Sequence, residues 1–370
     1  MNKQSQISTL RWSELTDLDK HAWDRFRATR PSLRSPFFSW DWIAHVNAVR
    51  NDISVLRVMQ NGSPVAYLPI QTNAFGWARP VGSPLCDWQG FISCENFKVD
   101  TDLLLTHLGV AGFKFSTVPP DDPLFQSIRG LVDASFALDL SAGYPAYATA
   151  QIAARPKAFR NYRSRLRRLA EAHPFYEVRL DDRDPAAFDE IIRLKSEQYR
   201  DTGQPNALRP AWTIKLLANL FSGDRADLHA RISTLRVNGR IIAGHLGLQE
   251  RGHLHYWFPV YDHKFADFSP GIVLLHEIAK AEGEHAVSTI DLGGGSYRFK
   301  EEFANSVLPF KSIRLARWGG RRIQPSLAHR AFPQDLARKL TRRIELFADM
   351  YTLRTLKGGG PAAARIPSTY

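Results

Sequence analysis

The spacing of apolar residues in the first 150 positions predicts a small mixed unit of helices and strands. Apolar residues at helical spacing are followed by runs that alternate apolar and polar, which is typical of strands. Asn61-Gly62 between two apolar runs is a strong hairpin signal, whereas Gly76 to Gly90 is rich in Gly and Pro and predicts a loop. The predicted elements are helices from Leu18 to Arg27 and Trp40 to Val49, a hairpin of Ser54 to Met59 with Val65 to Ile70, and strands from Phe113 to Val118 and Ala134 to Leu140.

The second half repeats this order of elements. Three consecutive strands, joined at Asn238-Gly239 and Arg251-Gly252, predict an antiparallel meander. The predicted elements are helices from Arg155 to Ala172, Pro185 to Tyr199 and Pro210 to Phe221, strands from Tyr176 to Leu180, Ala230 to Val237, Arg240 to Gln249 and His253 to Val260, a helix from Pro270 to Gly283, a strand from Ser288 to Leu292 and a short helix from Tyr297 to Phe303. The fold class is therefore α/β (α+β), with two tandem lobes that each hold a mixed, mostly antiparallel sheet flanked by helices. We place the lobes at residues 1–150 and 151–320, followed by a basic helix (Asp335 to Met350) and a Gly/Ala/Pro tail.

The helix from Arg155 to Ala172 is strongly basic on its polar faces. Phe159, Tyr162, Leu166 and Leu169 form one apolar stripe. The remaining faces hold a basic set without any acid among them: Arg155, Lys157, Arg160, Arg163, Arg165, Arg167 and Arg168. This helix and the basic stretch from Arg314 to Arg343 explain much of the net charge of +12. The charge favours phosphates, acidic lipid surfaces or nucleic acid as partners, although a solvated surface helix has the same pattern.

Composition narrows the class of protein. The hydrophobic content of 44%, with 22 Phe and nine Trp, is that of a folded chain. We find neither a run long enough to cross a membrane nor the apolar core of a signal peptide, so we expect a cytoplasmic protein. The two cysteines, Cys86 and Cys94, have no zinc spacing and the histidines are scattered, so we expect two thiols and no metal. No recognisable nucleic-acid module is present, so specific DNA binding is not expected.

The segment from Ser269 to Leu275 is the most informative part of the sequence. Serine suits a helix N-cap, and proline suits the first helical position. Gly271 would let a ligand approach the backbone closely, and the N–H groups at such a helix start bind phosphates. A well-capped helix without a ligand has the same pattern.

Four ordered motifs resemble those of the BioF2-like/CelD group of GNAT acyltransferases, which is related to the FemAB aminoacyl transferases with tandem GNAT lobes. The motifs are Tyr261-Asp262-His263-Lys264-Phe265, Ser269-Pro270-Gly271 with Leu274-Leu275, Asp291-Leu292-Gly293-Gly294-Gly295, and Tyr297-Arg298-Phe299-Lys300. The resemblance covers residues 150–315. It implies a GNAT domain at residues 151–320, a GNAT-like first lobe, and acetyl-CoA or another acyl-CoA as co-substrate. The usual donor loop has two glycines spaced to wrap pyrophosphate, whereas the segment from Lys264 to Gly271 has Gly271 alone.

Acyl transfer needs deprotonation of the acceptor, stabilisation of the carbonyl oxygen and close placement of both reactants. His245 and His255 are the candidate bases because they lie on neighbouring central strands, although each can equally be a structural histidine. Alternation places His253, His255 and Trp257 on one face of their strand, and Leu254, Tyr256 and Phe258 on the other.

The remaining candidates lie near the three glycines. Asp291 either orients a histidine, binds an acceptor amine, or bonds the following turn. Tyr297 and Lys300 are one helical turn apart and can point at one ligand. We expect the donor phosphates at Ser269, Gly271 and Ile272, with Lys300 binding phosphate or the oxyanion.

The resemblance implies N- or O-acyl transfer to a sugar or lipid-linked envelope or exopolysaccharide precursor. Acyl carrier protein and aminoacyl-tRNA are the other donors that it allows, and the second would make the protein a FemAB-like aminoacyl transferase. Peripheral contact with an anionic membrane through the basic stretches is a further expectation. A non-catalytic partner in a polysaccharide-synthesis assembly remains the third alternative, because of the incomplete donor loop.

Overall fold

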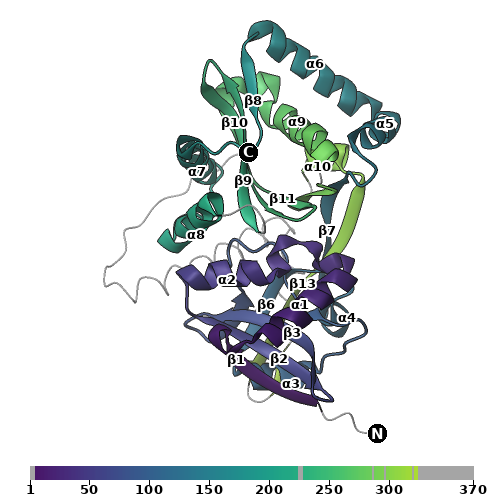
Figure 1. The fold of residues 1–370 in the computed structure, drawn as a ribbon, viewed down its shortest axis with the longest axis vertical. Helices are drawn as coiled ribbons and strands as arrows, with labels where there is room; N and C mark the ends of the chain where they lie inside the picture. Colours follow the sequence, from purple (N-terminus) through teal and green to yellow (C-terminus); the bar gives the residue numbers. More distant parts are fainter. Residues whose placement is uncertain (1–4, 224–227, 286, 296, 319–320, 324–370) are drawn as a thin grey trace.

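The computed structural model describes residues 5–223, 228–285, 287–295, 297–318 and 321–323. Two lobes lie one above the other, the first drawn in purple and blue and the second in teal and green (Figure 1). One mixed sheet runs through both lobes in the order β1-β2-β3-β4-β6-β13-β7-β12-β11-β10-β9-β8. The predicted fold class is confirmed.

The first lobe contains the predicted helices and hairpin. Asn61 and Gly62 both have positive φ, which the tight turn between its two strands requires. The elements are β1 (Ser5–Arg11), α1 (Asp17–Thr29), α2 (Trp40–Val49), β2 (Ile53–Gln60), β3 (Ser63–Thr72), β4 (Trp77–Pro80), β5 (Ile92–Ser93), α3 (Thr101–Leu108), β6 (Gly112–Val118), α4 (Pro123–Ser127) and β7 (Gly130–Asp139), with short 3-10 turns η1 (Trp12–Glu14), η2 (Pro31–Arg34) and η3 (Pro36–Phe38).

The second lobe begins with two helices and then repeats the order of the first. Its antiparallel meander of β9, β10 and β11 is the predicted one. The elements are α5 (Tyr144–Ala154), α6 (Pro156–Ala172), β8 (Tyr176–Arg179), α7 (Pro185–Asp201), α8 (Ala211–Ser222), β9 (His229–Val237), β10 (Arg240–Glu250), β11 (His253–Tyr261), η4 (His263–Phe268), α9 (Pro270–His285), β12 (Thr289–Gly294), α10 (Arg298–Phe303), β13 (Ser306–Trp318) and β14 (Arg321–Ile323).

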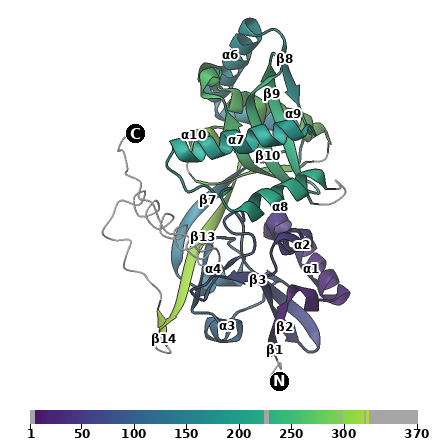
Figure 2. The same cartoon turned by 90° about the vertical axis from the view of Figure 1, so that its left-hand side faces the viewer.

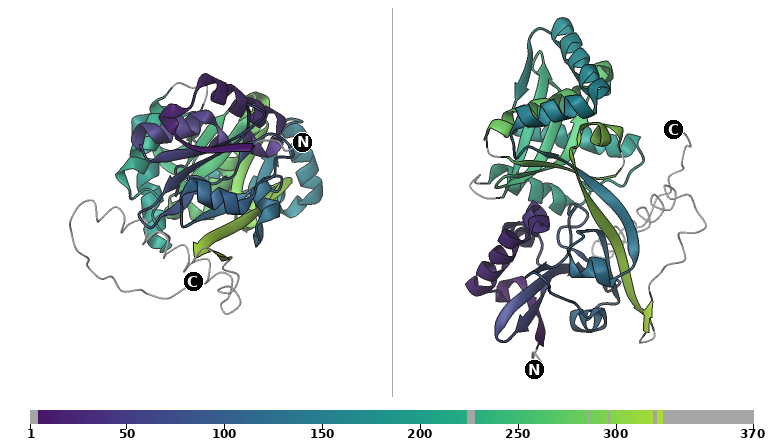
Figure 3. Two further views of the ribbon diagram at one scale, coloured as in Figure 1. Left: turned by 90° about the horizontal axis from the view of Figure 1, so that it is seen from below. Right: turned by 90° about the vertical axis from the view of Figure 1, so that its right-hand side faces the viewer.

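The two lobes exchange their last strands. From β1 in the first lobe and β8 in the second, and leaving out the short β5 and β14, the order is strand, two helices, three strands, helix, strand, helix and strand. The final strand of the first lobe, β7, pairs with β12 of the second, while β13 returns to pair with β6 of the first. β7 and β13 also pair with each other, as an antiparallel ribbon that runs between the lobes (Figures 2 and 3). Because of this exchange the sheet does not divide at one boundary along the chain, and residue 150 lies within α5, the first helix of the second lobe.

The hydrophobic core continues across the lobe boundary. Phe37 and Trp42 of the first lobe pack edge to face, and each also meets the ring of Trp257 on β11. α7 and α8 cover one face of the second-lobe sheet, and α5, α6 and α9 lie on the other side (Figure 1). Cys86 and Cys94 are free thiols. Among the described residues, every helix is too short or too polar to cross a bilayer.

Some elements differ from the prediction or lie outside it. β1, α3, α5 and the long β13 were not predicted, and β4 occupies part of the segment predicted as a loop. Phe258 lies on the same side of β11 as Trp257, contrary to simple alternation, because a bulge shifts the phase of this strand. The helix predicted from Asp335 to Met350, and most of the second basic stretch, lie outside the described residues.

Candidate active site

β11 and β12 pair over three positions and then separate. His253 lies opposite Thr289, Leu254 opposite Ile290, and His255 opposite Asp291. β12 then continues along β7, and none of its described residues pairs with β11 beyond His255. The C-terminal half of β11 therefore has an edge that β12 does not cover, and this opening begins at His255 and Asp291.

A bulge in β11 lies at the start of the opening. Leu246 pairs with Phe258 and Leu248 pairs with His255, so Tyr256 and Trp257 both stand opposite Gly247. Two residues opposite one form a β-bulge, which locally disrupts the ladder of hydrogen bonds and re-aims side chains. Bulges of this kind are common beside active sites.

His255 is buried between two carboxylates. Its Nδ1 lies 3.1 Å from Oδ2 of Asp291 and its Nε2 lies 2.8 Å from Oδ2 of Asp87. Burial alone would lower the pKa of His255, but Asp291 and Asp87 outweigh it and raise this pKa to about 9. At neutral pH the ring is therefore a cation that donates both protons, and it has no free nitrogen to act as a base.

The Asp291 carboxylate forms hydrogen bonds to His255, to residues of the first lobe and to the turn that follows it. One carboxylate oxygen accepts from Nε1 of Trp88 at 2.7 Å, and the other accepts from Oγ of Ser135 at 3.1 Å and from the backbone N–H of Gly293 at 2.8 Å. Burial would raise the pKa of Asp291, yet His255 and His253 hold it well below its usual range. Two of the interpretations of Asp291 are thus observed together, since it orients a histidine and also bonds the following turn.

The side chain of Lys300 extends from α10 to the turn that follows Asp291. Its Nζ donates to the carbonyl oxygens of Gly293 at 3.1 Å and Gly294 at 2.7 Å, and lies 5.4 Å from the centre of the Tyr297 ring. Burial lowers the pKa of Lys300, while Asp291 and Asp87 act against this shift. An ammonium has three protons, so one remains for a ligand. The structure therefore brings Asp291 and Lys300 together with His255, while Tyr297, which is 63% exposed, lies beside Lys300.

Asp87 and Trp88 come from the first lobe and were not predicted. They lie in the long connection between β4 and α3, which has no periodicity that would single them out. The Asp87 carboxylate is 49% exposed although the histidine it binds is buried. Asp87 thus stands at the mouth of the site, between the lobes.

Lys195 is another residue that sequence analysis missed. Its Nζ lies 2.8 Å from Oε1 of Gln198, 3.5 Å from the carbonyl oxygen of Pro259 on β11, and 5.3 Å from the Tyr199 ring. Burial lowers the pKa of Lys195 to about 8, and the charge of Asp87 acts in the opposite direction. A signal was present, because Lys195 follows Phe188 and Ile191 at helical spacing, where an apolar residue is expected.

His245 stands apart from this cluster. It is fully buried with its ring stacked on Tyr256 at 4.0 Å, and neither ring nitrogen has a hydrogen-bond partner. Burial, followed by the charges of Arg231 and His255, lowers the pKa of His245 well below its usual value. The two predicted histidines lie on opposite faces of the sheet, since His245 packs on the α9 side and His255 faces the first lobe.

The start of α9 is open at Gly271. A Cβ placed on Gly271 would meet no atom within 4 Å, whereas Ile272 packs against the core. Ser269 adopts a left-handed conformation (φ 46°, ψ 57°), whereas an N-cap residue is typically extended. Its carbonyl oxygen accepts from the N–H groups of Ile272 and Val273. Ser269 is also the residue that follows the 3-10 turn η4, so it joins this turn directly to α9. Arg168 of α6 lies over Phe268, 5.8 Å from the ring centre, and so places a cation beside this helix start.

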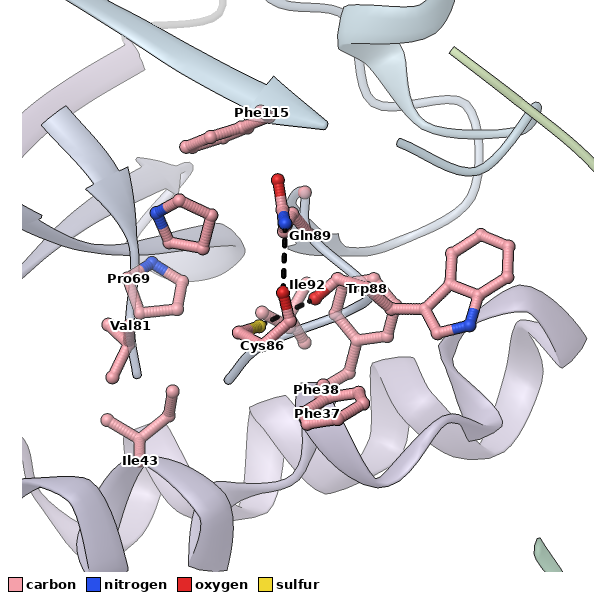
Figure 4. Close-up of a pocket in the computed structure, with 12 residues that line it drawn as sticks. Phe37, Phe38, Ile43, Pro69, Val81, Cys86, Trp88, Gln89, Ile92 and Phe115 are labelled. Carbon is pink, nitrogen blue, oxygen red and sulfur yellow. Dashed lines mark hydrogen bonds between the residues drawn. The ribbon is translucent and has the colours of Figure 1, made fainter. Parts of the chain in front are cut away.

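The corresponding opening of the first lobe is filled by its own chain. β4 and β6 pair at only two positions, and Gln89 then bonds β6 through Thr117 and Ser116. Figure 4 shows the cavity that remains between Phe37, Val81, Gln89 and Phe115, with a volume of ≈ 20 Å³. A space of this size holds about one water molecule and is far smaller than a small-molecule binding site. The first lobe therefore has no room there for an acyl donor, and it contributes Asp87 and Trp88 to the second lobe instead.

Three or more His, Cys, Asp or Glu side chains do not come together in a metal-binding group within the described ranges.

Known proteins resemble this chain in its second lobe and in its fold. Residues 156–301 match the acetyltransferase (GNAT) domain, whereas no curated protein sequence matches the chain. The C-terminal domain of a protein described as a lysylphosphatidylglycerol synthetase, from Agrobacterium fabrum, aligns over 89% of this chain and 96% of its own, with TM-score 0.51 and 14% identity. FemX aligns over 82% of this chain and 95% of its own, with TM-score 0.51 and 11% identity. These similarities support a GNAT-like fold and an acyltransferase domain in the second lobe.

Proposed function

Because residues 156–301 match a GNAT acetyltransferase domain, we propose that the chain transfers an acyl group, acetyl above all, from a phosphate-bearing thioester to an amine or hydroxyl. The proposed acceptor is a sugar or an envelope or exopolysaccharide precursor, in the cytoplasm. One observation carries the proposal of acyl transfer: β11 and β12 separate beside a bulge, at a buried His255–Asp291 pair that faces the other lobe. A thioester can lie along the uncovered edge of β11 while an acceptor enters between the lobes.

The donor's phosphates bind at the start of α9. The N–H groups of the first helical turn carry partial positive charge, and the open space at Gly271 lets an oxygen approach them. Arg168 adds a cation beside this point. These features supply the phosphate contacts that a second glycine would otherwise help to form.

The acceptor is deprotonated by Lys195 and held by Asp87. A lysine with a pKa near 8 has a useful neutral fraction close to neutral pH, as a general base requires. His255 cannot take this role because both nitrogens already donate to carboxylates. Its task is to fix Asp87, whose exposed oxygen then binds the acceptor amine or hydroxyl.

Lys300 stabilises the negative charge that develops on the carbonyl oxygen. The acceptor's nitrogen or oxygen forms a bond to the acyl carbon, and the acceptor proton passes to Lys195. The carbon–sulfur bond then breaks, and the leaving thiolate takes a proton from solvent. A hydrogen-bond donor such as this ammonium, held in place beside the carbonyl oxygen, commonly accelerates acyl transfer roughly 10²- to 10³-fold.

Calorimetric titration with acetyl-CoA tests the donor part of this proposal. We expect micromolar binding that Gly271→Asp abolishes, because a carboxylate at the helix start repels phosphate. Ala211→Asp is the matched control, since it puts the same charge at the exposed first residue of α8, and it should bind as the parent does. Absence of binding by the folded parent would exclude acetyl-CoA as donor, and tight binding of an aminoacyl-tRNA instead would favour aminoacyl transfer.

A further inference from the structure

The basic face of α6 surrounds a hollow far from the candidate active site. The hollow has a volume of ≈ 540 Å³ and lies against the first half of α6, next to α5. Its lining combines three arginines with apolar side chains and one hydroxyl: Arg160, Arg163, Arg167, Ile152, Pro156, Phe159 and Ser164. Since the arginines follow each other at intervals of three and four residues, they lie on one side of the helix.

The apolar stripe of α6 is already used inside the protein. Phe159 packs edge to face on Tyr162 and His276, and Tyr162 stacks on His276 with ring centres 4.0 Å apart. Leu169 is fully buried. The helix therefore cannot rotate its apolar face into a membrane, and only its charged side is available to a partner.

The charged side has little internal compensation. Glu171 is the only acid in α6, and its carboxylate lies 3.7 Å from Nε of Arg167 in a largely exposed pair. Exposed pairs of this kind contribute little. The turn that follows α6 places Phe175 in solvent with 85% of its surface exposed, so an unburied aromatic ring stands at the other end of the basic face.

We propose that this surface, made of Arg160, Arg163 and Arg167 around the hollow and Phe175 beyond the helix, docks on an anionic phospholipid membrane. A lipid phosphate binds the arginines, while its glycerol and first methylenes contact Ile152 and Pro156. Clusters of four to eight basic residues on a helix are typical of such contacts, and an exposed aromatic ring adds interfacial anchoring.

RNA is the other polyanion that such a charge attracts, and the structure favours it less. Proteins that bind single strands place aromatic faces beside the arginines for base stacking. Here the rings next to the arginines are buried, with Phe159 only 3% and Tyr162 only 8% exposed. The hollow instead offers the aliphatic surface of Ile152 and Pro156, which suits lipid carbons.

Vesicle co-sedimentation of the full chain tests this docking surface. The parent should bind vesicles of phosphatidylcholine with about one third phosphatidylglycerol and should not bind phosphatidylcholine alone. The triple variant Arg160→Gln/Arg163→Gln/Arg167→Gln should bind at least tenfold more weakly, and about a hundredfold if each arginine contributes as basic residues near acidic membranes usually do. Phe175→Ser should weaken vesicle binding by a smaller factor.

The matched control removes the same charge elsewhere. Lys20→Gln/Lys98→Gln/Lys215→Gln changes three exposed lysines outside α6 and should leave vesicle binding within twofold of the parent. Free glycerol phosphate at millimolar concentration should displace the protein from vesicles only weakly, because a single headgroup does not offer the extended anionic surface of a membrane.

Three results would overturn the proposal: an equal loss in both triple variants, strong competition by free glycerol phosphate, or vesicle binding that does not change in the arginine variant. If the arginine variant loses tRNA binding while vesicle binding is unchanged, the surface is an RNA site. Circular dichroism of each variant checks that it folds.

Discussion

Arg27 of α1 and Glu250 at the end of β10 form a buried bidentate ion pair across the two lobes. Nη1 of Arg27 lies 2.8 Å from Oε1 of Glu250, and its Nη2 lies 2.5 Å from Oε2. The side chains are 4% and 5% exposed. This pair, the exchanged strands and the shared core fix the lobes relative to one another, and with them the position of Asp87 over His255.

Removal of one partner of this pair should destabilise the protein strongly. Arg27→Met leaves the Glu250 carboxylate buried without its cation, which commonly costs about 3–5 kcal/mol. The double variant Arg27→Met/Glu250→Met removes both charges and should recover most of that loss. Urea unfolding of the parent, both single variants and the double variant measures the coupling. A double variant as unstable as the sum of the single variants would show that the two charges do not interact.

The His255–Asp291 pair should make stability depend on pH in a defined window. The raised pKa of His255, about 9, contributes stability that is fully present below the unfolded value of about 6.5 and is lost as pH rises through about 9. The lowered pKa of Asp291 contributes stability that is present above the unfolded value of about 3.9. This stability is lost as the pH falls through the lower pKa of the folded state.

Asp291→Asn should therefore be destabilising at pH 6, and the difference from the parent should shrink between pH 6.5 and 9. Thermal unfolding at five pH values from 5.5 to 9.5 measures it. Asp133→Asn, on the neighbouring strand β7, serves as the control for loss of a carboxylate. A destabilisation that does not vary with pH would mean that Asp291 acts only through its neutral hydrogen bonds, as to Gly293.

Sequence patterns predicted the fold of this protein better than its site, for physical reasons that particular residues show. Apolar periodicity and Asn-Gly turns are local, so the meander from β9 to β11 and the helix starting at Pro270 appeared in the right order. β13 was missed because a strand that crosses between two lobes has pairing partners far away in the chain. The bulge at Trp257 was missed for a related reason, since alternation assumes an unbroken ladder.

Some residues of the candidate site are far apart in the sequence, and only the folded chain brings them together. Asp291, Tyr297 and Lys300 were predicted because they flank the Gly-rich turn, and the contacts of Lys300 with Tyr297 and with the Gly293 carbonyl are local. Asp87 bonds His255 across 168 residues, and a loop aspartate has no periodicity that would reveal it. Lys195 had a signal that was not used, namely a lysine within an apolar stripe. His245 and His255 were indistinguishable by strand position, and both are buried, so only their partners separate them.

Lys300→Gln should impair the chemical step more than donor binding. A glutamine can keep one contact to a glycine carbonyl but has no positive charge for the oxyanion, so kcat should fall roughly 10²- to 10³-fold. The acetyl-CoA dissociation constant should stay within about threefold. Lys280→Gln, which changes an exposed lysine of α9, should match the parent. If donor affinity falls as much as kcat, Lys300 binds phosphate instead.

Lys195 should determine how acyl transfer depends on pH. The parent's kcat/KM should rise as pH increases toward about 8, where Lys195 loses its proton. Lys195→Met should reduce kcat by about 10²- to 10⁴-fold and flatten this rise, and Lys195→Arg should not rescue it, because an arginine stays protonated.

The stability of the Lys195→Met variant distinguishes a role of Lys195 as a base from a purely structural role. The lowered pKa of Lys195 disfavours the folded state while the lysine is charged, and this cost is complete below pH 8 and relieved above the unfolded value of about 10.4. Lys195→Met should therefore unfold at the same or a higher urea concentration than the parent at pH 7, despite its lost activity. A variant that is both destabilised and inactive, with an unchanged pH profile of the remaining activity, would identify Lys195 as a packing residue.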